Sequence, residues 1–220
     1  MATDASHALG ARPRLWVEFA ALYIGAPLAI ALFLPPRQLF TALFLFSLAG
    51  LILLWRTGGF DWHNLIRGWR RIPWAEVALV AVLTLVTGGA ILWATRPDAL
   101  FALARAEPWF LLVIWALYPL LSALPQELIF RPLFFHRFGS LFPDMRTAIL
   151  VNAAIFSFAH LMYWSVIVTV LTFAGGLVFA RAYVQRGFPS AWLLHAVAGN
   201  VIFAVGMGYY FYSGNVVRPF

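Results

Sequence analysis

The sequence contains no cysteine and no lysine, and few of its residues are acidic. The absence of cysteine excludes disulfide bonds, thiolate metal ligands and a cysteine nucleophile, so any catalytic chemistry must use other side chains. Only 10% of the 220 residues are charged, whereas an average soluble domain has about 25%. Polar surface this scarce cannot cover a globule in water. We therefore expect residues 1–220 to form a single membrane domain.

Long apolar runs occupy most of the chain, which is 63% hydrophobic and has a mean hydropathy of +0.86. A helix needs ~20 apolar residues to cross a bilayer, and clusters of Pro, Gly and Arg separate the runs. The predicted fold class is therefore all-α, a polytopic transmembrane helix bundle with about seven membrane helices. We expect these helices at residues 15–34, 41–55, 75–94, 109–135, 147–163, 165–183 and 191–212.

Residues 56–73 differ from the other gaps between apolar runs. Their aromatic and aliphatic side chains alternate with Asp61 and with arginines, which favours a short amphipathic helix in the cytoplasmic membrane interface. The alternative is a hydrated loop with aromatic anchors. The apolar members are Phe60, Trp62, Leu65, Ile66 and Trp69.

All 15 basic residues are arginines, and they give the chain a formal net charge of +7. They lie in short gaps rather than in a basic tail or stripe, so we expect membrane lipids as partners and no nucleic acid. Seven spans would put ten arginines on the side of the N-terminus and four on the other side, while Arg131 lies within a span. This asymmetry predicts a cytoplasmic N-terminus in a plasma membrane of bacterial type. The ten are Arg12, Arg14, Arg56, Arg67, Arg70, Arg71, Arg137, Arg146, Arg181 and Arg186, and the four are Arg37, Arg96, Arg105 and Arg218.

The fourth expected span carries a polar cluster of Gln126, Glu127 and Arg131. An ionisable side chain inside a bilayer costs several kcal/mol, so such residues point to function. Glu127 and Arg131 are four residues apart, share a helix face and can form an ion pair. A purely structural ion pair is the alternative interpretation, because pairing lowers the cost of both charges.

Two further spans each carry a histidine. Asn152, Phe156 and His160 recur every four residues in the fifth span and form one stripe of a helix. The seventh span holds His195 and Asn200. A single histidine on an apolar helix is more often a satisfied core residue than a ligand.

Taken together, three helices that each deliver a polar cluster indicate a shared internal site, because a membrane bundle turns its polar groups toward each other. Glu127, Arg131, His160 and His195 have the composition of a hydrolytic site. Glu127, His160 and His195 can hold a catalytic zinc ion that keeps an open position for water. Without metal, Glu127 can act as a general base while a histidine donates to the developing oxyanion.

The motifs resemble those of the CAAX-protease and bacteriocin-processing family of intramembrane peptidases, which includes the Ras-converting CAAX endopeptidase. The family motifs are Glu-Glu-x-x-x-Arg, Phe-x-x-x-His and His-x-x-x-Asn, each on its own membrane helix. Residues 121–200 carry the matching positions, from Gln126 and Arg131 through Phe156 and His160 to His195. The resemblance implies an endopeptidase that hydrolyses a peptide bond of a membrane-associated or lipidated protein or peptide.

The chain departs from the family pattern at two positions. Gln126 stands where the family usually has its first Glu, which is widely taken as the residue that activates water, and an amide cannot act as a base near neutral pH. Gly199 stands four residues after His195, where the family has Asn, and Asn200 follows at five. Asn152 can supply the missing amide instead.

These observations lead to one leading hypothesis and two rivals. In the leading hypothesis Glu127 activates water, Arg131 orients or charge-balances Glu127, and His160 and His195 stabilise the oxyanion or bind metal. The first rival is a catalytically silent relative that acts as a scaffold, chaperone or immunity protein, and the second is a small transporter, although the chain has no inverted repeat. Straight helices would leave His160 about 10 Å deeper than Glu127 and His195. Convergence therefore requires residues 134–145 to dip into the membrane or the fifth helix to tilt.

Overall fold

The apolar runs fold into helices throughout the part of the chain that the structure, a computed structural model, describes, namely residues 12–35 and 38–219. Seven helices there are long and apolar enough to cross a membrane, and no strand is present in these residues. The predicted all-α bundle of about seven membrane helices is therefore confirmed. The seven are Arg12–Phe33, Leu39–Arg56, Trp74–Thr95, Pro108–Leu141, Met145–Tyr163, Val166–Arg186 and Phe188–Val205.

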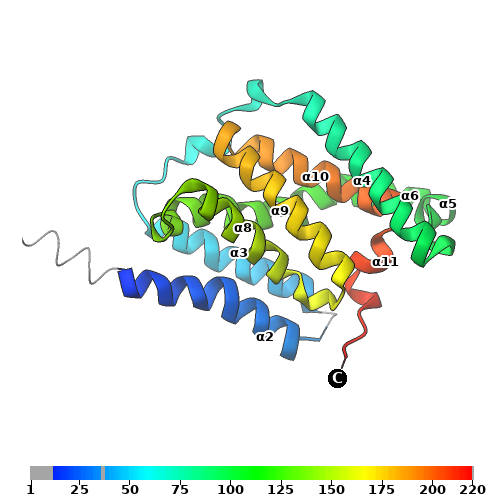
Figure 1. Cartoon of the computed structure of the whole chain (residues 1–220), viewed down its shortest axis with the longest axis horizontal. Coiled ribbons are helices and arrows are strands. Elements are labelled where there is room, and N and C mark those ends of the chain that lie inside the picture. The colour runs from blue at the N-terminus through cyan, green and yellow to red at the C-terminus, as the bar shows by residue number, and fades with distance from the viewer. Residues whose placement is uncertain (1–11, 36–37, 220) are drawn as a thin grey trace, which may run out of the picture.

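Several of these spans consist of more than one type of helical segment, and most of them run roughly alongside one another in Figure 1. The long fourth span changes type most often, and it carries the first of the expected motifs. The elements are η1 (Ala21–Gly25), α2 (Ala26–Phe33), α3 (Leu39–Arg56), η3 (Trp62–Leu65), η4 (Trp69–Arg71), α4 (Trp74–Thr95), η5 (Pro97–Ala99), α5 (Ala102–Ala106), α6 (Pro108–Tyr118), η6 (Pro119–Ala123), α7 (Leu124–Leu128), η7 (Ile129–Phe138), η8 (Gly139–Leu141), α8 (Met145–Ala159), η9 (Leu161–Tyr163), α9 (Val166–Arg186), α10 (Phe188–Val205), α11 (Gly208–Phe211) and η10 (Ser213–Asn215).

The prediction of an amphipathic helix across residues 56–73 is wrong. The segment contains only two short 3-10 turns, η3 and η4. Gly58, Gly59 and Gly68 interrupt it with positive φ angles, which end helical hydrogen bonding. At Gly68 the backbone also runs so close to the carbonyl of Arg186 that a Cβ would lie 2.7 Å from that oxygen. The segment is thus a loop held against the turn between α9 and α10.

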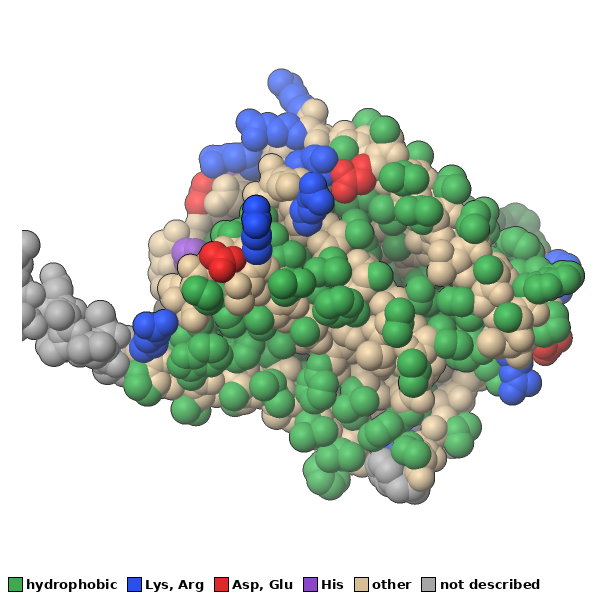
Figure 2. All heavy atoms as spheres, in the orientation of Figure 1, with side chains coloured by type: hydrophobic (Ala, Val, Ile, Leu, Met, Phe, Trp, Pro, Cys, Tyr) green, Lys and Arg blue, Asp and Glu red, His purple; other side chains and the backbone are tan. Residues whose placement is uncertain are grey.

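This loop lies at one end of the bundle. At the same end, ion pairs join helices that are far apart in the sequence. Arg137 donates to Glu18 at 3.0 Å, and Arg186 pairs with Glu76. Figure 2 shows the basic side chains gathered mainly over this end, while hydrophobic side chains cover the middle of the visible face. That division matches a bundle with an apolar belt and charged rims.

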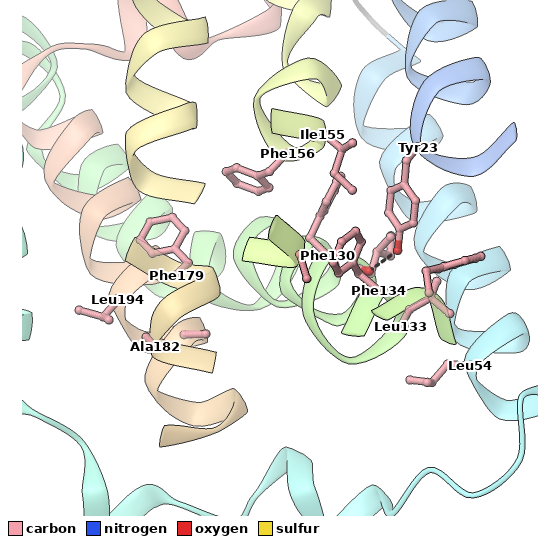
Figure 3. Close-up of a cluster of buried hydrophobic side chains, with 14 of the residues drawn as sticks. Tyr23, Leu54, Phe130, Leu133, Phe134, Ile155, Phe156, Phe179, Ala182 and Leu194 are labelled. Carbon is pink, nitrogen blue, oxygen red and sulfur yellow. Dashed lines mark hydrogen bonds between the residues drawn. The ribbon is translucent and has the colours of Figure 1, made fainter. Parts of the chain in front are cut away.

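The centre of the bundle is built around the fourth span. Its η7 segment is buried over most of its length, with Leu133, Phe134 and Phe138 fully enclosed. Tyr23 from the first span donates a hydrogen bond at 2.8 Å to the carbonyl of Ile129, which Figure 3 shows as a dashed line. The fourth span is therefore surrounded by other helices at the depth where it carries its charged residues.

The seventh span ends at Val205 rather than at the expected residue 212, because Gly206 adopts a left-handed conformation with φ of 105°. Met207 donates back to the carbonyl of Ile202 at 2.9 Å, which closes the helix end. A Cβ at Gly206 would overlap the carbonyl oxygen of Ala99. Two independent constraints thus require glycine at the end of the helix that carries His195.

Replacing Gly206 with alanine is expected to lower the free energy of unfolding by about 1–3 kcal/mol, because the left-handed backbone and the contact with Ala99 both resist a side chain. Gly139→Ala is the matched control, since nothing lies within 4 Å of its added Cβ. Thermal unfolding of the two purified variants in detergent, followed by circular dichroism, measures the difference. Equal melting temperatures for both variants would contradict this view of α10.

Candidate active site

A fully buried ion pair lies at the centre of the candidate site. Glu127 and Arg131 are both 0% exposed, and Arg131 Nε and Nη2 donate to the two carboxylate oxygens of Glu127 at 3.0 and 3.3 Å. Arg131 Nη1 also donates to the side-chain oxygen of Asn152. The predicted pairing of Glu127 with Arg131 is present, and Asn152 on α8 joins it as a further partner of the guanidinium.

The irregular backbone of the fourth span helps to position Glu127 and Arg131. Glu127 lies in the short α7, and Arg131 lies in the π-helical η7, which contains Pro132. Proline lacks an N–H and disrupts regular α-helical bonding. The carbonyl of Phe130 accepts from the amide nitrogen of Asn152, so α8 is tied to this irregular turn. Wide π-turns of this kind are frequent at functional sites.

His195 connects the ion pair to the cavity. Its Nδ1 lies 3.0 Å from Glu127 Oε1, and its Nε2 lies 3.1 Å from the Tyr118 hydroxyl. Because a carboxylate only accepts hydrogen bonds, Nδ1 carries a proton. Arg131 already balances the charge of Glu127, so a neutral imidazole with an unprotonated Nε2 leaves the cluster electrically neutral. The ring is fixed further by Phe179, stacked 4.9 Å away.

His160 lies beside the same aromatic side chain as His195. The Phe156 ring centroid is 4.8 Å from that of His160 and 5.5 Å from that of His195. His160 follows the last residue of α8, and its Nδ1 lies 2.7 Å from the carbonyl of Phe156. Since a carbonyl accepts, this Nδ1 carries the proton and Nε2 is an acceptor. The two histidines therefore converge despite the offset expected from straight helices.

A cavity of about 330 Å³ lies among α4, α6, α8, α9 and α10. A second, of about 100 Å³, lies on the side of α2 and α3, and Ser122, Gln126 and His160 line both cavities. His195 lines the larger cavity, whereas Glu127 does not line either. Most of the remaining lining is apolar. This is the composition of a ligand site.

Gln126 faces the cavities in place of the acidic residue that the family motif would put there. Its Nε2 donates to the Ser122 hydroxyl at 3.0 Å. The carboxylate of the neighbouring Glu127 is turned away toward Arg131 and His195. The two consecutive residues thus have separate environments, one in the cavity and one in the ion-pair network.

Asn200 is not brought into the site. Its Nδ2 donates to the carbonyl of Trp115 at 3.2 Å, and the indole N–H of Trp115 donates to the carbonyl of Asn200 at 3.0 Å. These bonds join α6 to α10. The position that faces the cavity is Gly199, as the helical angle of ~100° per residue requires.

Sequence reasoning missed Tyr118 and Ser122, which both line the larger cavity. A tyrosine and a serine in an apolar span do not stand out as charged residues do. The available signal is spacing, because Tyr118, Ser122 and Gln126 recur every four residues. They form one polar stripe that a search limited to ionisable groups overlooks.

The expected zinc alternative depends on Glu127, His160 and His195 acting as ligands together. Both Glu127 oxygens already accept from Arg131, one of them also faces His195 Nδ1, and His160 Nδ1 is engaged with a carbonyl. Across residues 12–35 and 38–219, no three His, Asp or Glu side chains are grouped to hold a metal ion. The donors as arranged do not fit a three-ligand zinc site. Zinc binding at this site stays a prediction.

Comparison with known proteins gives a match to the family that the motifs resemble. Residues 108–202 match the family model described as type II CAAX prenyl endopeptidase Rce1-like. No curated protein and no solved structure matches the chain. The matched segment includes Tyr118, Ser122 and Gln126 of the larger cavity, together with Glu127, Arg131, His160 and His195. Residues 108–202, the motif-bearing part of an integral membrane protein, are therefore similar to the Rce1-like type II CAAX prenyl endopeptidases, a family of proteases, which confirms the resemblance in the motifs.

Proposed function

We propose that this chain is an intramembrane endopeptidase that hydrolyses a peptide bond of a membrane-associated or lipidated protein or peptide. The observation that carries the proposal is a histidine that lines a cavity and whose Nδ1 is hydrogen-bonded to a buried carboxylate. His195 Nδ1 lies 3.0 Å from Glu127, while His195 lines the cavity of about 330 Å³. A carboxylate–imidazole pair of this kind is the general-base arrangement of many hydrolases.

In the proposed mechanism Glu127 acts through His195 rather than on water directly. Both Glu127 oxygens are occupied and the side chain is 0% exposed, so no water reaches it without breaking the ion pair. Its contribution is to hold the Nδ1-protonated form of His195 and to stabilise the imidazolium that forms during proton transfer. Arg131 prevents Glu127 from taking the proton itself, because a buried carboxylate beside a guanidinium favours its charged form.

His195 Nε2 removes a proton from a water in the cavity as that water attacks the substrate carbonyl carbon. The same nitrogen then returns the proton to the leaving amine, so the imidazole ends neutral. His160, whose Nε2 is an acceptor, holds the attacking water from a second direction. Gln126 contacts the substrate through its amide. The apolar remainder of the cavity suits a segment or lipid chain that arrives from the membrane.

Gln126 supports a second candidate function, a catalytically silent relative that acts as a membrane scaffold, chaperone or immunity protein. An amide in the cavity cannot remove a proton from water near neutral pH. In that case the Glu127–Arg131–His195 network would serve only to hold helices together. The two candidates differ in whether His195 is needed for cleavage.

We also propose that the N-terminus faces the cytoplasm of a bacterial plasma membrane. The arginine asymmetry supports this orientation, which would put the loop between α3 and α4 in the cytoplasm and the loop between α4 and α6 outside.

The endopeptidase proposal predicts that His195→Ala lowers cleavage by about 10²–10⁴-fold, the usual contribution of a general base. The fold should persist, because Glu127 keeps its bonds to Arg131. His63→Ala is the matched control, since that histidine is exposed in η3, outside the cavities.

Two readouts measure cleavage by the full chain. The first is release of the C-terminal tripeptide from a prenylated CAAX peptide in proteoliposomes. The second is a comparison of new protein termini in membranes from cells that express the wild type or a variant. If His195→Ala and the wild type give the same fragments, or if the wild type gives none in either assay, the silent function replaces the endopeptidase.

The orientation is testable because the chain has no cysteine, so a single introduced cysteine is a unique label. Asp98→Cys, in η5, should react with a membrane-impermeant maleimide on intact cells, and Arg70→Cys, in η4, should react only after lysis. Both positions are exposed, which makes them a matched pair. The opposite pattern of labelling would reverse the proposed orientation.

A further inference from the structure

Tyr118, at the end of α6, is the hydroxyl-bearing residue nearest to the proposed base. Its Oη lies 3.1 Å from His195 Nε2, and its ring meets the His195 ring edge-on at 6.1 Å. Tyr118 also lines the larger cavity. The hydroxyl therefore lies at the point where water and substrate would meet His195.

The ring of Tyr118 occupies space that Gly199 leaves open. A Cβ at Gly199 would overlap three atoms of the Tyr118 side chain, including its hydroxyl oxygen. Gly199 lies one helical turn after His195, so the tyrosine packs directly beside the histidine on α10. The Phe203 ring packs edge-on against the Tyr118 ring with centroids 5.6 Å apart, and the reciprocal bonds of Trp115 and Asn200 join α6 to α10 nearby. Tyr118 is thus held in place by packing that does not depend on its hydroxyl.

Among the described residues that line the cavity, the donor bonded to the proposed base is the Tyr118 hydroxyl, 3.1 Å from His195 Nε2. Nδ1 carries the proton in both His160 and His195, so each presents an acceptor nitrogen at Nε2. Of the amides, Gln126 Nε2 donates to Ser122, and Asn152 is turned toward Arg131 and Phe130. The Tyr118 hydroxyl is the donor beside the base.

We propose that Tyr118 is a catalytic residue whose hydroxyl donates a hydrogen bond to the oxyanion of the tetrahedral intermediate, a role that rests on the endopeptidase function proposed above. In the resting site the hydroxyl donates to His195 Nε2. When substrate binds, the hydroxyl turns to the substrate carbonyl oxygen, which frees Nε2 for water.

The water oxygen then bonds to the carbonyl carbon, the carbonyl π electrons move to the oxygen, and the water proton moves to Nε2. The oxyanion accepts the Tyr118 hydrogen bond without taking the proton. On collapse, the C–N bond breaks and the leaving nitrogen takes the proton from Nε2. The products are a carboxyl group and an amine, and Tyr118 is unchanged.

The test is Tyr118→Phe in the full chain, which removes the hydroxyl and retains the ring against Gly199. Loss of an oxyanion donor lowers kcat by about 100-fold or more, while KM should stay within about 2-fold because the contact forms in the transition state. Tyr210→Phe is the matched control, since its hydroxyl donates to Thr95 at 2.8 Å, outside the cavity. Cleavage is measured per folded molecule, with the prenylated peptide and with the fragments found in membranes.

A second pair of variants separates packing from chemistry. Gly199→Ala should lower the melting temperature, because its Cβ overlaps Tyr118, and adding Tyr118→Ala should restore the melting temperature by removing the ring. Cleavage should stay low in the double variant, because the hydroxyl is still missing. Recovery of both stability and cleavage would reduce Tyr118 to a packing residue and overturn the proposal.

The pH dependence distinguishes donation to the substrate from an effect through His195. In Tyr118→Phe the acid limb of the pH dependence of kcat should stay where it is in the wild type, because in the substrate complex the hydroxyl has already turned away from His195 Nε2. A shifted limb, or kcat within about 3-fold of the wild type, would contradict the oxyanion role. If His195→Ala abolishes cleavage while Tyr118→Phe does not, only this inference fails. If His195→Ala leaves cleavage intact, the proposed function itself fails.

Discussion

The buried ion pair between Glu127 and Arg131 is the interaction on which the rest of the site depends. Removing two charges from water is costly, and breaking such a pair by deleting one partner costs about 3–5 kcal/mol. Here the cost is offset by a bidentate contact, by Asn152 on α8 and by His195 on α10. The pair therefore joins three spans, and the buried η7 keeps it away from lipid.

This pair also determines which groups remain available for chemistry. Because Arg131 occupies the carboxylate, Glu127 is withdrawn from the cavity and is left to orient His195. The cavity then receives nitrogen acceptors from two histidines, an amide from Gln126 and a hydroxyl from Tyr118. Charge is kept behind the cavity wall and neutral polar groups line it. Such a division keeps the cavity free of net charge.

The sequence was sufficient for the parts that follow from hydropathy and motif spacing. The number of spans, the pairing of Glu127 with Arg131 and the convergence of helices bearing His160 and His195 all follow from apolar run length, the i,i+4 rule and inward-facing polarity. Other features depend on backbone conformation and tertiary packing. The glycines at 58, 59 and 68 broke a helix that periodicity favoured, and the packing of Trp115 against Asn200 removed that asparagine from the site. Tyr118 went unnoticed because it carries no charge, and its closeness to His195 depends on the space that Gly199 leaves open.

The central claim is that Glu127 holds His195 with its Nδ1 protonated and its Nε2 available to the cavity. Solid-state nitrogen-15 NMR of histidine-labelled full-length protein in lipid bilayers tests this most directly, with the His195 signals assigned through His195→Asn. At neutral pH the account predicts a neutral His195 ring with a protonated Nδ1 and an unprotonated Nε2. A ring with its single proton on Nε2 would contradict the account, because the carboxylate of Glu127 would then not be the group that orients the base.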